Sequence, residues 1–217
     1  MPPEDNPPRI ETKVIRTRAR ATAHREQVTP LYMASGFTFD SAEQARATYV
    51  GEQPGYVYTR WDNPNNDELV ARMCVLEGAE AGLPMASGMA AIFTVLAGLL
   101  NSGDHVVASR SLFGATHQVL TTVLPRWGIA HSYADCELTA TWPDLFRPET
   151  RLCLVETPSN PGLTLVDLAW AAELCRERGV VLVVDNTFAT PVVQRPLALG
   201  ADLVVHSTTK FLDGQGR

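Results

Sequence analysis

The sequence has few cysteines, and their spacing suggests neither a metal site nor a disulfide framework. None of the four, Cys74, Cys136, Cys153 and Cys175, takes part in a CxxC or a Cys/His ligand spacing. Cys74, Cys153 and Cys175 lie in apolar periodic segments, which is typical of small buried hydrophobic residues. This pattern predicts no metal and indicates a reducing compartment.

Long apolar runs and an excess of positive charge are also absent. The N-terminal MPPEDNPPRIETK has no apolar signal-peptide region, and the longest apolar run, residues 89–100, is too short to span a bilayer. The formal net charge is −6, which argues against nucleic acid as the main partner. We therefore expect a cytoplasmic protein with neither a membrane nor a nucleic-acid partner.

The composition is that of a globular protein, with 45% hydrophobic and 19% charged residues. Residues 1–62 are rich in Pro, Thr and Arg and show one short helix, over 41–51, with Ser41 as its N-cap and Gly51 as its stop. We interpret residues 1–62 as an extended arm that makes oligomer contacts. Residues 63–217 are interpreted as one large domain.

Helices and strands alternate along that domain. The expected helices cover 63–80, 86–100, 111–128 as far as Pro125, and 163–179, which Gly179 ends. The expected strands cover 104–109, 129–134, 151–159, 180–186 and 202–207. Because these strands are unbroken apolar runs, we predict an α/β fold with a mostly parallel sheet flanked by helices.

Ligands of such sheets bind beyond the carboxyl ends of the strands, and polar clusters follow three of them: residues 156–160, 185–186 and 206–210. Asp185 suits a helix cap, a structural acceptor or a partner for a buried cation, and Lys210 alone suits a solvated loop. Together they meet the needs of a pyridoxal 5'-phosphate site, which takes a lysine for covalent attachment and an acid for the ring nitrogen.

A phosphate cradle is predicted at the start of the helix over 86–100. There Ser87, Gly88 and Met89 offer free backbone N–H groups, and Gly88 permits a close approach. Ser207 and Thr209 would add hydroxyl donors. Taken alone, Ser87 and Gly88 also suit an ordinary N-cap and turn.

The chain resembles the Cys/Met-metabolism, or trans-sulfuration, family of pyridoxal-phosphate enzymes. The stretches that carry the resemblance are GYVYTRWDNPN (55–65), LEGAEAGLPMASGMAAI (76–92), SLFGATHQVL (111–120), VETPSNP (155–161), VVDNTFATP (183–191) and LGADLVVHSTTKFLDGQGR (199–217). The resemblance implies fold type I of the pyridoxal-phosphate transferases. It also implies an amino-acid substrate.

The resemblance also implies roles for single residues. Lys210 would bind the cofactor covalently and carry protons, Asp185 would pair with the ring nitrogen, and Asn160 would contact the ring hydroxyl. The phosphate would be held by Ser87, Gly88, Met89, Ser207 and Thr209.

Tyr58 and Arg60 would reach the phosphate of a neighbouring subunit. A homodimer would therefore complete the sites, within a homotetramer.

Phe113 lies where the family stacks an aromatic ring on the cofactor and counts with Lys210 among the candidate catalytic residues. Many members have Tyr there, and Phe cannot transfer a proton. FGAT (113–116) and KFLDGQGR (210–217) resemble O-succinylhomoserine sulfhydrylases, which implies that a homoserine ester and sulfide give homocysteine in methionine biosynthesis. A cystathionine β- or γ-lyase, cystathionine γ-synthase, methionine γ-lyase and an inactive cofactor-binding fragment remain open. So does the ester group.

Members of the family are roughly twice as long as this chain and continue into a C-terminal domain, which supplies an arginine for the substrate carboxylate. We therefore expect the 217 residues to be an N-terminal fragment that lacks this domain and is inactive alone.

Overall fold

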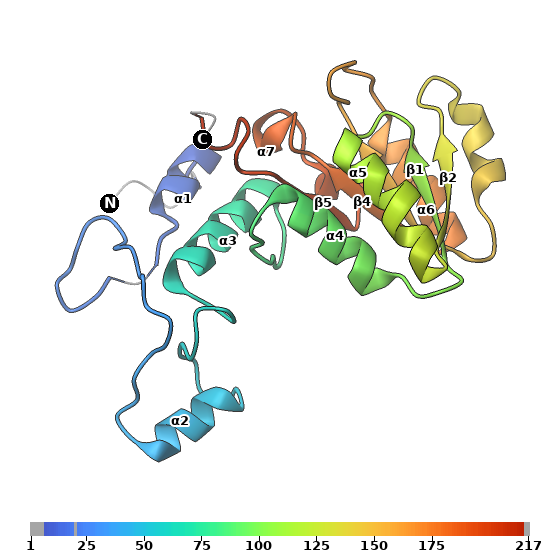
Figure 1. Ribbon diagram of the computed structural model, residues 1–217. Helices are drawn as coiled ribbons and strands as arrows, with labels where there is room; N and C mark the ends of the chain where they lie inside the picture. Colours follow the sequence, from blue (N-terminus) through green and yellow to red (C-terminus); the bar gives the residue numbers. More distant parts are fainter. Residues whose placement is uncertain (1–6, 20, 215–217) are drawn as a thin grey trace. The chain divides into compact units, whose positions relative to one another are not determined.

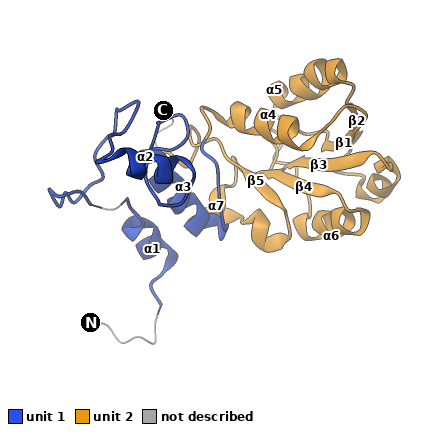
Figure 2. Cartoon of the chain, turned by 90° about the horizontal axis from the view of Figure 1, so that it is seen from below, with its two compact units in different colours: residues 1–84 blue, residues 85–217 orange. Residues whose placement is uncertain are grey.

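The computed structural model describes residues 7–19 and 21–214 (Figure 1). The chain divides into two compact units between Pro84 and Met85 (Figure 2). The change of composition near residue 62 lies within the first unit, so the helix predicted over 63–80 belongs to that unit. The role of residues 1–62 in oligomer contacts stays a prediction.

The first unit contains three helices among its described residues: α1 (Ile10–Arg16), α2 (Ala42–Tyr49) and α3 (Pro64–Glu77). The predicted helix over 41–51 is confirmed as α2, and the Ser41 hydroxyl accepts a hydrogen bond from the Gln44 amide at 3.1 Å. Gly78, with a φ of 73°, ends α3 in the left-handed conformation that glycine adopts readily. The sequence patterns did not predict α1.

The second unit is built on a five-stranded sheet whose order is β2-β1-β3-β4-β5, and every neighbouring pair is parallel. Its strands are β1 (His105–Ser109), β2 (Ala130–Ala134), β3 (Thr150–Glu156), β4 (Val181–Asp185) and β5 (Leu203–Val205). The predicted α/β class with a parallel sheet is confirmed.

Helices cover both faces of this sheet (Figure 2). They are α4 (Gly88–Leu99), α5 (Gly114–Gln118), the π-helical η1 (Val119–Val123), the 3-10 helices η2 (Leu124–Trp127), η3 (Thr139–Leu145) and η4 (Pro196–Leu199), α6 (Leu168–Arg178) and α7 (Thr190–Val193).

Alternate residues of one strand pack into different cores. Leu152 and Leu154 of β3 join a core with α4, η1 and η2, whereas Cys153 and Val155 join a second core with α6 and η3. Both faces are therefore buried, which explains why the strands read as unbroken apolar runs.

Two predicted helices differ from the observed ones. The segment predicted as one helix over 111–128 divides into α5, η1 and η2, and η2 includes Pro125. The helix predicted from 163 begins at Leu168, because the Asp167 carboxylate caps it by accepting from the Trp170 amide at 3.0 Å. No helix within the described residues is long and apolar enough to cross a membrane.

Candidate active site

The strand order predicts a ligand crevice at the carboxyl ends of β1 and β3. From β1 the chain goes to β2 on one side and then to β3 on the other, so the loops that leave β1 and β3 diverge. Open α/β sheets bind their ligands at such a point. Phe113 follows β1, Asn160 follows β3, Asp185 ends β4, and Lys210 follows β5. The structure thus brings these four predicted residues to one edge of the sheet.

Asp185 lies in a row across this edge. It pairs with Glu156 of β3 on one side and with Val205 of β5 on the other. Its Oδ1 accepts a hydrogen bond from the Thr187 amide at 3.0 Å, so Asp185 also caps the turn that follows β4. A carboxylate has two oxygens, so this turn bond is compatible with a second, functional contact.

The loop that carries Lys210 is held to the turn after β4. The Ser207 amide donates to the Thr187 hydroxyl at 2.9 Å, and the Lys210 amide donates to the Ser207 carbonyl at 3.3 Å. Phe211 meets Phe188 edge to face, with ring centroids 5.6 Å apart. The Lys210 side chain itself is exposed to solvent.

The start of α4 approaches the loop after β5 closely. A Cβ atom placed on Gly88 would lie 2.7 Å from the Cβ of Ser207, so only glycine permits this approach. Ser87 accepts from the Ala90 amide at 3.1 Å and is therefore an N-cap, as the plainer interpretation had it. The helix itself provides no acceptor for the amides of Gly88 and Met89. They and the half-buried Ser207 form one polar corner.

A phosphorylated aldehyde fits this set of donors. The corner at Gly88, Met89 and Ser207 offers amide and hydroxyl donors at a helix N-terminus, where a phosphate is favoured. Lys210 offers an amine, and Asp185 a carboxylate, at the same sheet edge. Thr209 is exposed beside Lys210, and its contact with a phosphate stays a prediction.

Glu156 is a member of the site that received no role from the sequence patterns. It ends β3 with 6% of its surface exposed. One carboxylate oxygen accepts from the Phe113 amide at 2.6 Å, and the other accepts from the Asn160 amide at 3.3 Å. Burial, with the nearby Asp185 carboxylate, raises the pKa of Glu156 to about 7, although the two amide bonds act in the opposite direction. The signal that could have found it is a glutamate at the end of a buried strand.

A pair of side-chain amides, the buried Asn186 and the half-buried Gln194, braces the loops after β3 and β4. Asn186 donates to the Gln194 carbonyl at 2.8 Å, and the Gln194 side chain donates to Asn186 at 2.9 Å and to the Thr157 carbonyl at 2.8 Å. Asn186 is fully buried. This network supports the turn that begins at Asp185, and the sequence patterns did not predict it.

Tyr58 and Arg60 belong to the first unit and lie together. The Arg60 guanidinium carbon is 5.2 Å from the centroid of the Tyr58 ring. Tyr58 is held by a bridge to Gly36, and the Thr59 amide donates to the Ser35 carbonyl at 2.9 Å. Both side chains are exposed, and their contact with a neighbouring subunit's phosphate stays a prediction.

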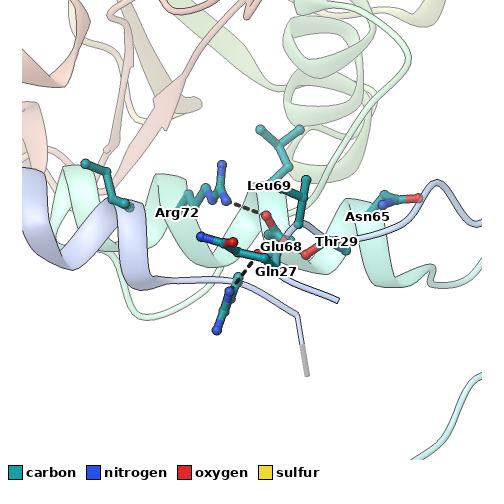
Figure 3. Close-up of a pocket in the computed structure, with 9 residues that line it drawn as sticks. Gln27, Thr29, Asn65, Glu68, Leu69 and Arg72 are labelled. Atoms are coloured by element: carbon teal, nitrogen blue, oxygen red, sulfur yellow. Dashed lines mark hydrogen bonds and ion pairs between the residues drawn. The ribbon is translucent and has the colours of Figure 1, made fainter. Parts of the chain in front are cut away.

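The first unit also contains a cavity of about 500 Å³ beside α3 (Figure 3). Glu68 lies at its wall, with an ion pair to Arg72 at 2.5 Å and hydrogen bonds from the Ala19 amide and the Thr29 hydroxyl. Asn65 binds the arm as well, donating to the Pro30 carbonyl at 2.7 Å. No predicted site residue lines the cavity. The hydrogen bonds of Glu68 and Asn65 hold the arm on α3.

Within residues 7–19 and 21–214, no cluster of histidine, cysteine and acidic side chains could hold a metal ion.

A model of the family of Cys/Met metabolism PLP-dependent enzymes matches residues 11–217 of the chain. The chain is 44% identical over 208 residues to O-succinylhomoserine sulfhydrylase of Pseudomonas aeruginosa, covering 96% of this chain and 52% of that protein. It is 40% identical over 206 residues to L-methionine gamma-lyase of Porphyromonas gingivalis, covering 94% and 52%. The chain thus spans about half the length of these relatives.

Solved structures show the same relationship. The putative O-acetylhomoserine (thiol)-lyase of Campylobacter jejuni has a TM-score of 0.90 and 31% identity, covering 96% of this chain and 51% of that one. That structure carries N'-pyridoxyl-lysine-5'-monophosphate. The cystathionine gamma-lyase of Lactobacillus plantarum, in complex with L-serine, has a TM-score of 0.87 and 32% identity, covering 96% and 52%.

Proposed function

Because the chain belongs to the family of Cys/Met metabolism PLP-dependent enzymes, we propose that it supplies the cofactor site of an enzyme that exchanges the γ-substituent of a homoserine ester. The substrates would be O-succinylhomoserine, or a related ester, and sulfide, and the product would be homocysteine. Relatives with the sulfhydrylase name at 43–44% identity support this choice.

One observation carries the proposal: the corner between Gly88 and Ser207 lies on the same sheet edge as Asp185 and Lys210. A phosphate at the corner, an acid for a ring nitrogen and an amine for an aldehyde are the three contacts that pyridoxal phosphate needs. The resemblance of HSTTK to the family motif is consistent with this arrangement.

When bound, pyridoxal phosphate withdraws electrons from the amino acid that is attached to it. The chain's own residues orient the reaction and move the protons. The Lys210 amine would take the proton from the substrate Cα and return protons as the γ-substituent is exchanged. Asp185 would hold a proton on the ring nitrogen. Phe113 would pack on the ring, and it has no hydroxyl to share the proton transfers, so these fall to Lys210.

A γ-elimination reaction is the second candidate, because L-methionine gamma-lyases match at 38–43% identity. The two reactions share the first proton transfers and differ in what happens after the γ-substituent leaves. In the first, sulfide adds at Cγ; in the second, no nucleophile adds, and water releases the remainder as a 2-oxo acid and ammonia. A third candidate is a chain that binds the cofactor at this site but catalyses neither reaction.

The assembly is part of the proposal. Tyr58 and Arg60 would reach the phosphate of a second copy, and an arginine fork binds phosphate through two hydrogen bonds. A homodimer would then complete two sites, and two dimers would form a tetramer.

The chain is well suited to a labelling experiment, because its only lysines are Lys13 and Lys210. The purified chain would be mixed with pyridoxal phosphate, reduced with borohydride and mapped by mass spectrometry. We expect the label on Lys210, no label there in K210A, and normal labelling in K13A. Label at Lys13 or at the amino terminus alone would refute the proposed site.

Because the chain alone is expected to be inactive, the reaction is tested on a protein that joins this chain to the C-terminal half of an O-succinylhomoserine sulfhydrylase. This extended protein is given O-succinylhomoserine, with and without sulfide. Homocysteine formed in the presence of sulfide supports the exchange reaction, whereas 2-oxobutyrate from methionine supports the lyase. K210A should form neither product.

A further inference from the structure

Glu156 connects the two loops that flank the predicted crevice. It ends β3, and its carboxylate accepts from the backbone of Phe113, in the loop after β1, and from the backbone of Asn160, in the loop after β3. The side chains of these two residues are the ones expected on the ring face and at the ring hydroxyl of the cofactor. Glu156 therefore holds the backbone of two residues whose side chains would contact the cofactor.

We propose that Glu156 is a positioning residue, whose carboxylate sets the places of Phe113 and Asn160 by binding their backbone amides. This inference rests on the proposed function, since it assigns those two side chains to the cofactor. In this role Glu156 connects the loops after β1 and β3, so that together they form one wall of the proposed cofactor site.

The geometry favours a carboxylate in this position. Two amide donors from different loops converge on this one side chain, and Phe113 lies 43 residues from Glu156 along the chain. A carboxylate accepts at both oxygens, whereas a carboxamide accepts at one and presents a donor at the other. The 2.6 Å distance between the Phe113 amide nitrogen and the carboxylate oxygen is that of a short hydrogen bond.

A second contact ties the same strands together beneath the loops. The Glu156 amide donates to the Ser109 hydroxyl at 3.3 Å, and Ser109 is the last residue of β1. The backbone of Glu156 is therefore bound to β1, in addition to the contact of its side chain with Phe113. This leaves the carboxylate little freedom and makes it a precise support for the loop.

A carboxylate in this position also costs free energy. This cost argues against the alternative that Glu156 only caps the end of β3. The side chain is buried beside the Asp185 carboxylate, and this environment disfavours the charged form. Strongly perturbed acids in a crevice are found at functional sites more often than elsewhere. A cap of the β3 turn alone would require only the bond to Asn160.

The test uses Glu156→Gln, which keeps the shape of the side chain, with Glu149→Gln as the matched control. Glu149 is exposed and immediately precedes β3 at its opposite end. Amide hydrogen exchange of the chain without cofactor is measured first. We expect exchange at Phe113 or Asn160, or at both, to be faster by about 10-fold or more in E156Q and unchanged in E149Q, since a charged hydrogen bond is lost.

The second measurement is the visible circular dichroism of the chain with pyridoxal phosphate bound. A positioning role predicts an altered signal in E156Q while Lys210 is still labelled by borohydride. An unchanged signal, or faster exchange spread evenly over the whole chain, would overturn the inference in favour of a purely structural role. If the wild-type chain and E149Q also fail to bind the cofactor, the proposed function fails, and the inference fails with it.

A measurement on the unmodified chain covers the case in which E156Q does not fold. The amide proton resonance of Phe113 should move as Glu156 titrates, because the carboxylate accepts its hydrogen bond. A Phe113 resonance that stays constant through the titration would show that the contact is absent and would overturn the inference.

Discussion

The close contact between Gly88 and Ser207 allows a direct test of the polar corner as a phosphate site, with the variant Gly88→Ala. The added Cβ would lie 2.7 Å from the Ser207 Cβ, 3.2 Å from its Cα and 3.3 Å from its Oγ. Ordinary carbon contacts need about 3.5–4.0 Å, so α4 and the loop after β5 must separate by roughly 1 Å. The Ser207 amide bond to Thr187 resists that movement from the side of the loop.

The expected cost follows from two opposing terms. Overpacking costs about 1–3 kcal/mol, and replacing glycine in a helix recovers at most about 1 kcal/mol. If the strain is relieved by opening the corner, affinity for pyridoxal phosphate should fall by about 10-fold to 100-fold. The free energy of unfolding should fall by about 0–3 kcal/mol.

Gly98→Ala is the matched control, because Gly98 lies in the same helix and its Cβ would meet nothing within 4 Å. It should raise the free energy of unfolding by about 0.5–1 kcal/mol and leave cofactor affinity unchanged. The assay is a cofactor titration followed by visible absorbance, together with urea unfolding of all three proteins. Equal cofactor affinity in G88A and G98A would refute the close approach as the basis of the corner.

Three further predictions concern acidic residues. Asp185→Asn should keep the turn bond to the Thr187 amide but lose the proposed partner of the ring nitrogen. The cofactor should still bind, while turnover should fall by at least about 100-fold in a steady-state assay of the chain joined to the C-terminal half of an O-succinylhomoserine sulfhydrylase; full turnover would contradict the pairing. The pKa of Glu156 is raised in the folded chain, so its ionisation destabilises the fold. Its contribution to the free energy of unfolding should be most favourable below about pH 4.5. That contribution should fall by up to about 3 kcal/mol as the pH rises to about 7. Urea unfolding at several pH values should show this dependence in the wild type minus E156Q difference, and a flat difference would disprove it. Glu68→Gln should loosen the arm from α3, so limited proteolysis between residues 17 and 32 should become faster, whereas an unchanged rate would show that Glu68 is not the anchor.

The strands could be predicted from the sequence because burial on both faces leaves a continuous apolar run. Asp185 and Lys210 became candidate site residues because each follows such a run and because the two together suit a pyridoxal phosphate site, and their roles stay predictions. The start of α6 was predicted too early, since the apolar residues at 163–166 continue the pattern of the helix, while the capping bond of Asp167 decides where the helix begins.

The role of Glu156 could not be read from the sequence, because it depends on β1 and β3 being neighbours. The order of strands in the sheet places the Phe113 loop beside Glu156, and no local pattern encodes that order. The same limit applies to the contact of Gly88 with Ser207. A glycine at a helix start indicates a possible close approach, but not the residue that is approached.

These contacts imply that holding the cofactor and using it depend on different parts of the chain. The corner at Gly88 and the wall held by Glu156 are made by backbone atoms that packing fixes in place. Lys210 is instead exposed at the end of a turn, and in the proposed site it would act through its side chain. G88A should therefore weaken binding while Lys210 can still be labelled at high cofactor concentration, and K210A should lose the label while retaining reversible binding. If both variants lost binding and labelling together, the corner and the lysine would form a single cooperative unit, contrary to this division.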